Sequence, residues 1–220
     1  MESSYPTPPA PSAPSGYPLT FSVDYPEREL NRLTTFFRLF TLIPIAIVLA
    51  TVSGGSYSTT YDGATSVAVA AGGLLFLAPL LMILFRKKYP VWWVDWNREL
   101  LRFTNRVHIY AWLMDDTYPS TDEQQSLHLD FATPNAETEL ARGMPLVKWF
   151  LAIPHIIVLF FLYIAAWICV IISWFAILFT GRYPRSLFDF VQGVLRWGNR
   201  VGAYAFILIT DRYPPFSLQP

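Results

Sequence analysis

The chain has 220 residues, of which 53% are hydrophobic and only 15% are charged. Globular domains usually carry about a quarter charged residues, so this balance favours a membrane protein. Lysine and arginine together number 16, as do aspartate and glutamate, so the net charge gives no reason to expect nucleic acid as a partner.

Residues 1–16 are rich in proline and serine and contain no basic residue. This composition predicts a disordered tail and excludes a cleavable signal peptide, which needs a basic and an apolar region. The spacing of Pro8, Pro11 and Pro14 would suit a polyproline II ligand. The tail is therefore a candidate binding segment for a protein partner.

Two apolar stretches follow in the first half of the chain. Residues 36–53 are short for a membrane span and carry Arg38, whereas residues 64–85 have no charge. A span needs about 20 apolar residues, which the second stretch supplies. The glycine, serine and threonine residues between the two stretches indicate a loop, so the pair predicts a membrane hairpin.

A third apolar stretch, residues 146–179, is interrupted only by Lys148 and His155. One helix of this length would measure about 50 Å, well beyond a hydrocarbon core of about 30 Å. A hairpin has the opposite difficulty, because no glycine or proline marks a turn near the middle. Basic residues flank the stretches and avoid the expected hairpin tips. The positive-inside rule then favours two hairpins with both termini in the cytoplasm, and one long helix stays the alternative.

A phrase of ten residues occurs twice. Residues 101–110 read LRFTNRVHIY, and residues 195–204, which begin 94 positions later, read LRWGNRVGAY. The match continues to a closing Tyr-Pro turn that comes one residue later in the second copy, and it includes RLFTLIP (38–44) against KWFLAIP (148–154) and FSVDYP (21–26) against LHLDFATP (127–134). The chain therefore predicts two tandem units, residues 17–122 and 123–220.

Alternating apolar residues predict a short strand near the start of each unit, at residues 19–23 and 127–131. Around the repeated phrase, apolar residues recur at spacings of three and four over residues 91–114 and 185–209, which predicts two interfacial amphipathic helices. The expected fold class is a mainly α integral membrane protein. Each of its two tandem repeats would hold a transmembrane helical hairpin, an interfacial amphipathic helix and short cytosolic β-strands.

The repeated arginines are the strongest candidate site residues. Arg196 and Arg200 lie four residues apart, and no acidic residue at helical spacing relieves their repulsion. They require an anion, which is either a carboxylate elsewhere in the chain or a lipid phosphate of the cytoplasmic leaflet. Arg102 and Arg106 hold the matching positions in the first unit. Aromatic rings favour interfacial depth, so the expected membrane anchors are Trp92, Trp93, Trp96, Trp149 and Trp197.

Catalytic and metal-binding motifs are missing from the sequence. The three histidines, His108, His128 and His155, lack metal-ligand spacing, and the single cysteine, Cys169, cannot form an intrachain disulfide. We therefore expect no enzyme, no metal and no cofactor. His155 is a candidate intramembrane polar site, because ionisable groups at membrane depth are often functional. Its counterpart in the first unit is the apolar Ile45, so contact with interfacial water is the alternative.

The second unit, GRYPRSLFDFVQGVLRWGNRVGAYAFILITDRYPPFSL with MPLVKWFLAIPH upstream, resembles an uncharacterised family of bacterial membrane proteins. The family is common in actinobacteria and is known only as a domain of unknown function. The resemblance is close over residues 127–218 and looser over residues 18–119. The first unit departs from the pattern in its inserted loop and in DDTYPSTD, where the second unit has TDRYPPF. The resemblance implies a membrane protein and no particular activity.

These features together predict a non-enzymatic, multi-pass inner-membrane protein. It would act as an accessory or scaffold subunit that contacts anionic lipid of the cytoplasmic leaflet. A small transporter or lipid-handling protein is the alternative, because the contact between two repeats often houses a substrate path. A membrane-bound enzyme comes third, since the fold could still assemble carboxylates or histidines at an interface.

Overall fold

The computed structural model describes residues 16–53, 56–61, 64–69 and 77–220. The proline-rich tail up to residue 15 lies outside the described residues, so its disorder and its role stay predictions. The elements in chain order are β1 (Leu19–Val23), α1 (Arg32–Phe36), α2 (Arg38–Ser53), β2 (Ser56–Tyr61), β3 (Ala64–Val69), α4 (Leu77–Arg86), α5 (Val91–Ala111), β4 (Leu127–Phe131), α6 (Met144–Thr180), α7 (Arg185–Gly202) and the π-helical turn η1 (Ala203–Ile207).

The two expected short strands are found, and they pair with each other. β1 and β4 are antiparallel, with Leu19 opposite Phe131 and Phe21 opposite Leu129. Residues alternate along each strand between a buried face and an exposed one, because successive side chains of a strand point to opposite sides. Strands of five residues need a partner to be stable, and here each supplies the other's partner from a distant part of the chain.

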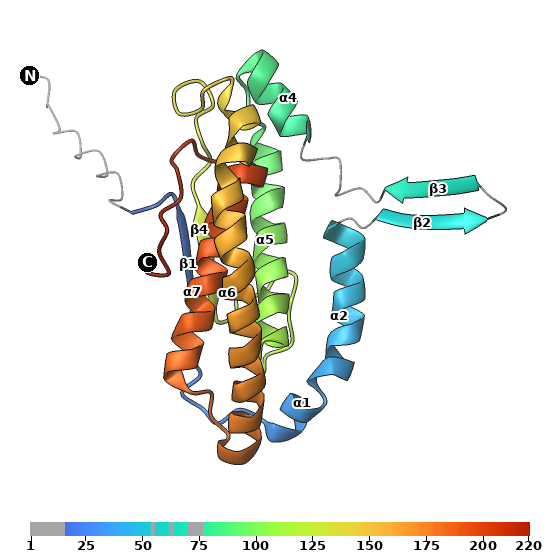
Figure 1. Ribbon diagram of the computed structural model, residues 1–220, viewed down its shortest axis with the longest axis vertical. Helices are drawn as coiled ribbons and strands as arrows, with labels where there is room; N and C mark the ends of the chain where they lie inside the picture. The colour runs from blue at the N-terminus through green and yellow to red at the C-terminus, as the bar shows by residue number, and fades with distance from the viewer. Residues whose placement is uncertain (1–15, 54–55, 62–63, 70–76) are drawn as a thin grey trace, which may run out of the picture.

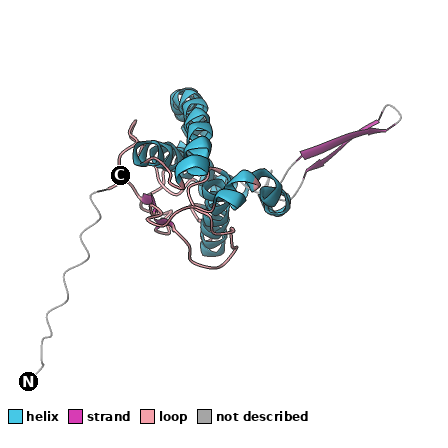
Figure 2. Cartoon of the chain, turned by 90° about the horizontal axis from the view of Figure 1, so that it is seen from below, coloured by secondary structure: helices cyan, strands magenta, loops and turns pink. Residues whose placement is uncertain are grey.

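The helices lie in two layers on the buried face of this sheet. α7 packs between β1 and α6, and α5 packs between β4 and α2. Figure 1 shows α2, α5, α6 and α7 running roughly side by side, with the β2 and β3 hairpin extending away from them. In Figure 2 the β1 and β4 sheet lies on the opposite side of α7 from α6. The helices that carry the repeated phrase, α5 and α7, are therefore the middle layer.

The phrase helices start and end in matching ways. Pro90 and Pro184 precede their first residues, where a fixed φ and a missing N–H suit a helix start. The chain leaves each of these helical segments through a leucine with a left-handed backbone. This residue is Leu113 after α5 and Leu208 after η1, and φ is 63° at both. The stretch between the phrase and its Tyr-Pro turn is one residue longer after α7 than after α5, and η1 accommodates this residue, since a π-turn holds one residue more than an α-turn.

The expected membrane hairpins are wrong. Residues 146–179 belong to one continuous 37-residue helix, α6, in agreement with the absence of a turn residue at its middle. Within residues 64–85 the chain forms β3 and then α4, and β3 pairs with β2, so this stretch is not a spanning helix. In the sequence ATSVAV every second residue is β-branched (Thr65, Val67 and Val69), a pattern that favours a strand. Among the described residues, α6 alone is both long and apolar enough to cross a membrane.

The expected position of the amphipathic helices also needs correction. α5 ends at Ala111 and α7 at Gly202, and both pack between the sheet and an outer helix, which covers most of their length, while the start of α5 stays exposed at Trp92 and Trp96. Their polar face contacts the edge of β1 and β4, which explains how a helix with two arginines can be buried. The multi-pass fold class is replaced by a mainly helical structure with a small sheet and one candidate membrane helix.

Candidate functional site

A buried ion pair lies at the start of α2. Arg38 pairs with Asp116 at 2.6 Å, and both side chains are almost fully buried. Asp116 also accepts the backbone N–H of Asn31, and Arg38 donates to the carbonyl of Asp115 at 3.2 Å. The guanidinium lies 4.0 Å above the ring of Tyr110, the tyrosine that ends the first phrase. The pair therefore joins α2, the end of α5 and the Asp-Thr-Tyr-Pro turn.

The start of α6 holds the same arrangement with a different cation. Lys148 is completely buried and pairs with Asp211 at 2.8 Å. Asp211 accepts the N–H of Ala141, and Lys148 donates to the carbonyl of Thr210 at 2.7 Å. The ammonium lies 5.2 Å from the ring of Tyr204, which ends the second phrase. The repeated tyrosine and the repeated aspartate thus enclose one internal cation in each half of the chain.

The arginines of the second phrase are turned toward the sheet and the C-terminal segment. Arg196 donates through Nε to the carbonyl of Phe21 at 2.9 Å and through Nη1 to that of Leu218 at 2.8 Å. Arg200 donates to the carbonyl of Gln219 at 2.9 Å. Burial lowers the pKa of both guanidinium groups, and their mutual repulsion lowers that of Arg196 further. These two arginines fasten the first strand and the chain end to α7.

The arginines of the first phrase make related contacts. Arg102 donates to the carbonyl of Leu129 at 2.9 Å, the residue paired with Phe21 in the sheet, and forms ion pairs with Glu99 at 2.6 Å and Asp130 at 3.3 Å. Arg106 donates to the carbonyls of Ser120 and Thr121. All four predicted arginines therefore have internal acceptors, which are mostly backbone carbonyls rather than carboxylates. Contact with lipid phosphate stays a prediction.

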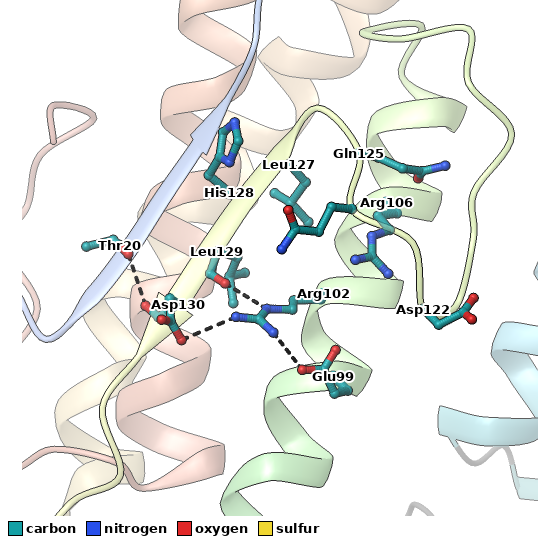
Figure 3. A pocket seen from close by; sticks show the side chains of 11 residues that line it. Thr20, Glu99, Arg102, Arg106, Asp122, Gln125, Leu127, His128, Leu129 and Asp130 are labelled. Atoms are coloured by element: carbon teal, nitrogen blue, oxygen red, sulfur yellow. Dashed lines mark hydrogen bonds and ion pairs between the residues drawn. The ribbon is translucent and has the colours of Figure 1, made fainter.

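A polar groove opens beside Arg102 and Arg106, between α5, β4 and the segment that joins them. Its volume is about 380 Å³. Figure 3 shows Arg106 between Gln125 above and Arg102 below, with Asp122 on the joining segment to its right and Arg102 held by Glu99 and Asp130. The Nε of Arg106 is buried, with no acceptor among the described residues. The full lining is Thr20, Glu99, Arg102, Arg106, Asp122, Gln124, Gln125, Leu127, His128, Leu129 and Asp130.

The asparagine of each phrase meets its counterpart. The amide of Asn105 donates to the side-chain oxygen of Asn199 at 2.7 Å, and that of Asn199 donates back at 2.8 Å. Both residues are buried. Each asparagine also donates to the carbonyl four residues earlier in its own helix. This reciprocal pair fixes the register of α5 against α7.

The tryptophans predicted as interfacial anchors divide into two groups. Trp92 and Trp96 are exposed on α5, at 68% and 38%. Trp93 and Trp197 are buried at 5% each, and the half-buried Trp149 donates its indole N–H to the carbonyl of Ala205. An anchor needs access to lipid, so the exposed pair fits that role geometrically and the buried pair lines the core.

His155, the predicted intramembrane polar site, lies in the core where α6, α7 and the C-terminal segment meet. It is fully buried, and its Nδ1 accepts the indole N–H of Trp197 at 3.1 Å. Its ring stacks on Phe216, with centroids 3.9 Å apart. The Nε2 atom has no partner among the described residues. His155 therefore holds three elements together.

Two features were not anticipated from the sequence alone. The pairing of Lys148 with Asp211 joins residues 63 positions apart, and the repeat was the signal that could have found it, since Arg38 and Asp116 occupy the matching positions. The groove gathers residues from α5, β4 and an irregular segment, which no single motif marks. Within the parts of the chain that the structure describes, no cluster of three potential metal ligands is found.

Comparison with known families finds one match. Residues 144–217 match the family model described as a domain of unknown function, DUF4389. The match covers α6, α7, η1 and most of the C-terminal segment and does not reach the first half of the chain. This supports the resemblance over part of the range expected for the second unit. Neither the curated proteins nor the solved structures contain a match.

Proposed function

We propose that this protein is a non-enzymatic, membrane-associated accessory or scaffold protein whose outer helices contact lipid. The observation that carries the proposal is the outer face of α6. In its most apolar stretch of 18 residues only 22% are buried, although an apolar helix of a soluble protein is normally covered. The exposed aromatic side chains of this face include Phe150, Phe160, Phe161, Trp167 and Phe179.

The outer face of α2 has the same character. Its exposed residues include Leu39, Phe40, Ile43 and Ile47. The short helix α1 joins the two, since Phe36 stacks on Trp174 of α6 and the indole of Trp174 donates to the carbonyl of Thr35. Transfer of the apolar surface of α2 and α6 from water into lipid would stabilise membrane binding by about 25 cal/mol per Å² of that surface.

The geometry favours a helix that lies along the membrane rather than across it. Exposed apolar residues run from Leu146 to Phe179, which is about 50 Å at 1.5 Å per residue. To fit a hydrocarbon core of about 30 Å, α6 would need a tilt of roughly 50°, beyond the range of about 0 to 40° seen for spanning helices. A helix that lies in the plane of the interface does not have to match the thickness of the hydrocarbon core.

The sheet side supports the same orientation. α7 and the sheet lie alongside α6, so an upright α6 would carry them into the hydrocarbon layer. The outer face of the sheet exposes Asp24, His128 and Asp130, whose side chains are 60–68% exposed. A single aspartate at the bilayer centre costs about 2.5–3.5 kcal/mol on insertion scales. With α6 in the membrane plane, these residues stay in water.

The proposal also includes a preference of this protein for anionic lipid. Exposed basic residues stand at both ends of α6, with Arg86, Lys88 and Arg142 near its start and Arg32 and Arg182 near its end. Each basic residue near an anionic surface contributes about 1 kcal/mol. Glu137 and Glu139 lie in the same region and reduce the positive field. The preference for anionic lipid is therefore expected to be modest.

The remaining finer features rest on the sequence and on matched contacts. We propose that residues 17–122 and 123–220 are copies of one unit, because the ion pairs, tyrosines and asparagines described above recur at matching positions. Location at the cytoplasmic leaflet and a bacterial, mainly actinobacterial source stay predictions. A carrier with a path between the copies is less favoured, since the amides of Asn105 and Asn199 bond to each other there.

The membrane proposal is tested by vesicle flotation of the full chain. Wild-type protein should float with vesicles of phosphatidylcholine and phosphatidylglycerol, and more weakly with phosphatidylcholine alone. Replacing Phe150, Phe161 and Phe179 together by serine should reduce flotation several-fold, because these side chains are 64–79% exposed and contribute little to folding. The control is Ser22→Ala on the outer face of the sheet, which should float like wild type. Flotation that does not respond to the phenylalanine variant would contradict the proposal.

A further inference from the structure

The segments that follow the two phrase helices are not equally close to them. In the second half, the backbone near Leu218 lies against α7 at Gly193. A Cβ atom at Gly193 would come within 2.9 Å of the Leu218 Cβ and 3.1 Å of its carbonyl oxygen. Only glycine permits this approach, and through it the C-terminal segment covers Arg196 and Arg200.

The matching residue of the first half is Glu99, 94 positions earlier in the chain. A carboxylate side chain stands where the second half has no side chain at all, and it pairs with Arg102. The following segment reaches Arg106 only through the carbonyls of Ser120 and Thr121. The space that Leu218 fills beside α7 corresponds to the polar groove beside α5.

The charges that face this groove are only partly balanced. Arg102 is neutralised by Glu99 and Asp130. Arg106 is 94% buried, given its 6% exposure, and within the described residues it has no carboxylate within 4.0 Å. Asp122 is exposed at the rim, where it accepts from the hydroxyls of Ser120 and Thr121 but has no described cation within that distance. One buried positive charge and one rim carboxylate are thus left without an ionic partner.

Electrostatics supports an anion at Arg106. Burial lowers the pKa of this guanidinium, which means that its charged form is poorly solvated, and the nearby Arg102 lowers it further while Glu99 and Asp122 oppose the effect. A phosphate or carboxylate in the groove would supply an acceptor to Nη2, for which no hydrogen bond is described and which, unlike Nε, is not among the fully buried atoms. A simple anion fits less well, because the groove wall also holds the carboxylates of Glu99, Asp122 and Asp130.

We propose that the groove binds a small zwitterion, with its phosphate or carboxylate on Arg106 and its amine on Asp122. A volume of about 380 Å³ is at the small end of ligand pockets and suits a molecule of phosphoethanolamine size. Figure 3 shows that the two residues come from α5 and from the segment before β4, so a ligand between them would join these elements. The same chemistry occurs in a free metabolite and in a phosphatidylethanolamine headgroup.

Calorimetry on the full chain in detergent tests the proposal with three probes, which are phosphoethanolamine, inorganic phosphate and ethanolamine. We expect phosphoethanolamine to bind at one site, at least tenfold more tightly than either fragment. Arg106→Gln should weaken it at least tenfold. Asp122→Asn should weaken it several-fold and remove the advantage over inorganic phosphate. Asp122 is exposed, so that variant keeps the proposal testable if Arg106→Gln does not fold.

The control is Arg185→Gln, an exposed arginine in the first turn of α7, which should leave binding unchanged. Equal affinity for inorganic phosphate and phosphoethanolamine, absence of binding, or normal binding by both groove variants would overturn the proposal. A vesicle arm distinguishes the two sources of the ligand. Displacement of phosphoethanolamine by vesicles that contain phosphatidylethanolamine, but not by phosphatidylcholine vesicles, indicates a lipid headgroup. Binding that such vesicles leave unchanged indicates a free molecule.

Discussion

The surroundings of α5 and α7 differ although both helices carry arginines at the same positions. Around α7 the chain end lies against Gly193 and supplies the carbonyls of Leu218 and Gln219 to Arg196 and Arg200. Around α5 the matching residue is Glu99, and a groove remains beside the arginines. One side chain on the neighbouring turn therefore decides whether a buried arginine serves the fold alone or also faces a space open to a ligand.

A second difference concerns the internal cations. The guanidinium of Arg38 makes three contacts at once. It pairs with Asp116, donates to the carbonyl of Asp115 and lies over the ring of Tyr110. Lys148 is a compact charge whose neutralisation depends on Asp211. We therefore expect the two halves to differ in their tolerance for losing the carboxylate.

Loss of the carboxylate of Asp211 should be the most damaging of these changes. We expect Asp211→Asn to lower the free energy of unfolding by about 3–5 kcal/mol, because it leaves the charge of fully buried Lys148 uncompensated. Asp116→Asn should cost less, since the delocalised guanidinium of Arg38 lies 4.0 Å over the ring of Tyr110, whereas the compact ammonium of Lys148 lies 5.2 Å from the ring of Tyr204. Denaturant unfolding of the full chain in detergent measures both. Partial recovery in Lys148→Met with Asp211→Asn is expected, and equal losses in the two single variants would break the comparison.

Replacing one arginine in each phrase should give the next largest difference. Arg196→Met removes two charge-assisted hydrogen bonds to Phe21 and Leu218 in a buried site, for which we expect a loss of about 3 kcal/mol. Arg102→Met should cost about 1 kcal/mol, because the side chain of Arg102 is 29% exposed and its ion pairs reach water. The same unfolding experiment applies. A larger loss for Arg102 would show that the first phrase, not the second, anchors the sheet.

A third pair of variants, with an expected loss no larger than that of Arg196→Met, tests the close approach at Gly193. Gly193→Ala should destabilise the protein by about 1–3 kcal/mol, because the added methyl group meets the backbone of Leu218. Gly202→Ala in the same helix is the matched control, since its Cβ would have no neighbour within 4 Å. It should be neutral or stabilise by up to about 1 kcal/mol. If both variants behave alike, the covering of Arg196 and Arg200 does not depend on glycine.

Much of the local structure follows from local patterns. Alternation at Leu19, Phe21 and Val23 predicted a strand, and the turn residues before Val91 and Arg185 marked where the phrase helices begin. The residue inserted after the second phrase was visible in the sequence, and η1 accounts for it. These features depend on residues close together in the chain, which is why a pattern can reveal them.

The failures have a physical reason too. The expectation of hairpins depended on the positive-inside rule, which ranks orientations only once a segment is assumed to cross the membrane. This rule was given more weight than the lack of a turn residue in 146–179, where the structure has one helix. The partners of the arginines could not be foreseen, because they are backbone carbonyls without a sequence signal. Those of Phe21 and Leu129 lie on the paired strands β1 and β4, and the others lie on irregular segments that follow each helix. The difference between Gly193 and Glu99 is present in the sequence. Its structural consequence depends on the C-terminal segment, which packs against α7 at Gly193.

The depth of α6 in a bilayer tests the functional account most directly. Spin labels would be attached at Phe150→Cys, Phe161→Cys and Phe179→Cys in a Cys169→Ser background, with Ser22→Cys as the water-facing reference, and their accessibility to oxygen and to a polar nickel complex compared. The account predicts the same shallow depth at all three positions on α6 and water at Ser22. Labels near opposite surfaces at Phe150 and Phe179 with Phe161 at the centre, or all three in water, would contradict it.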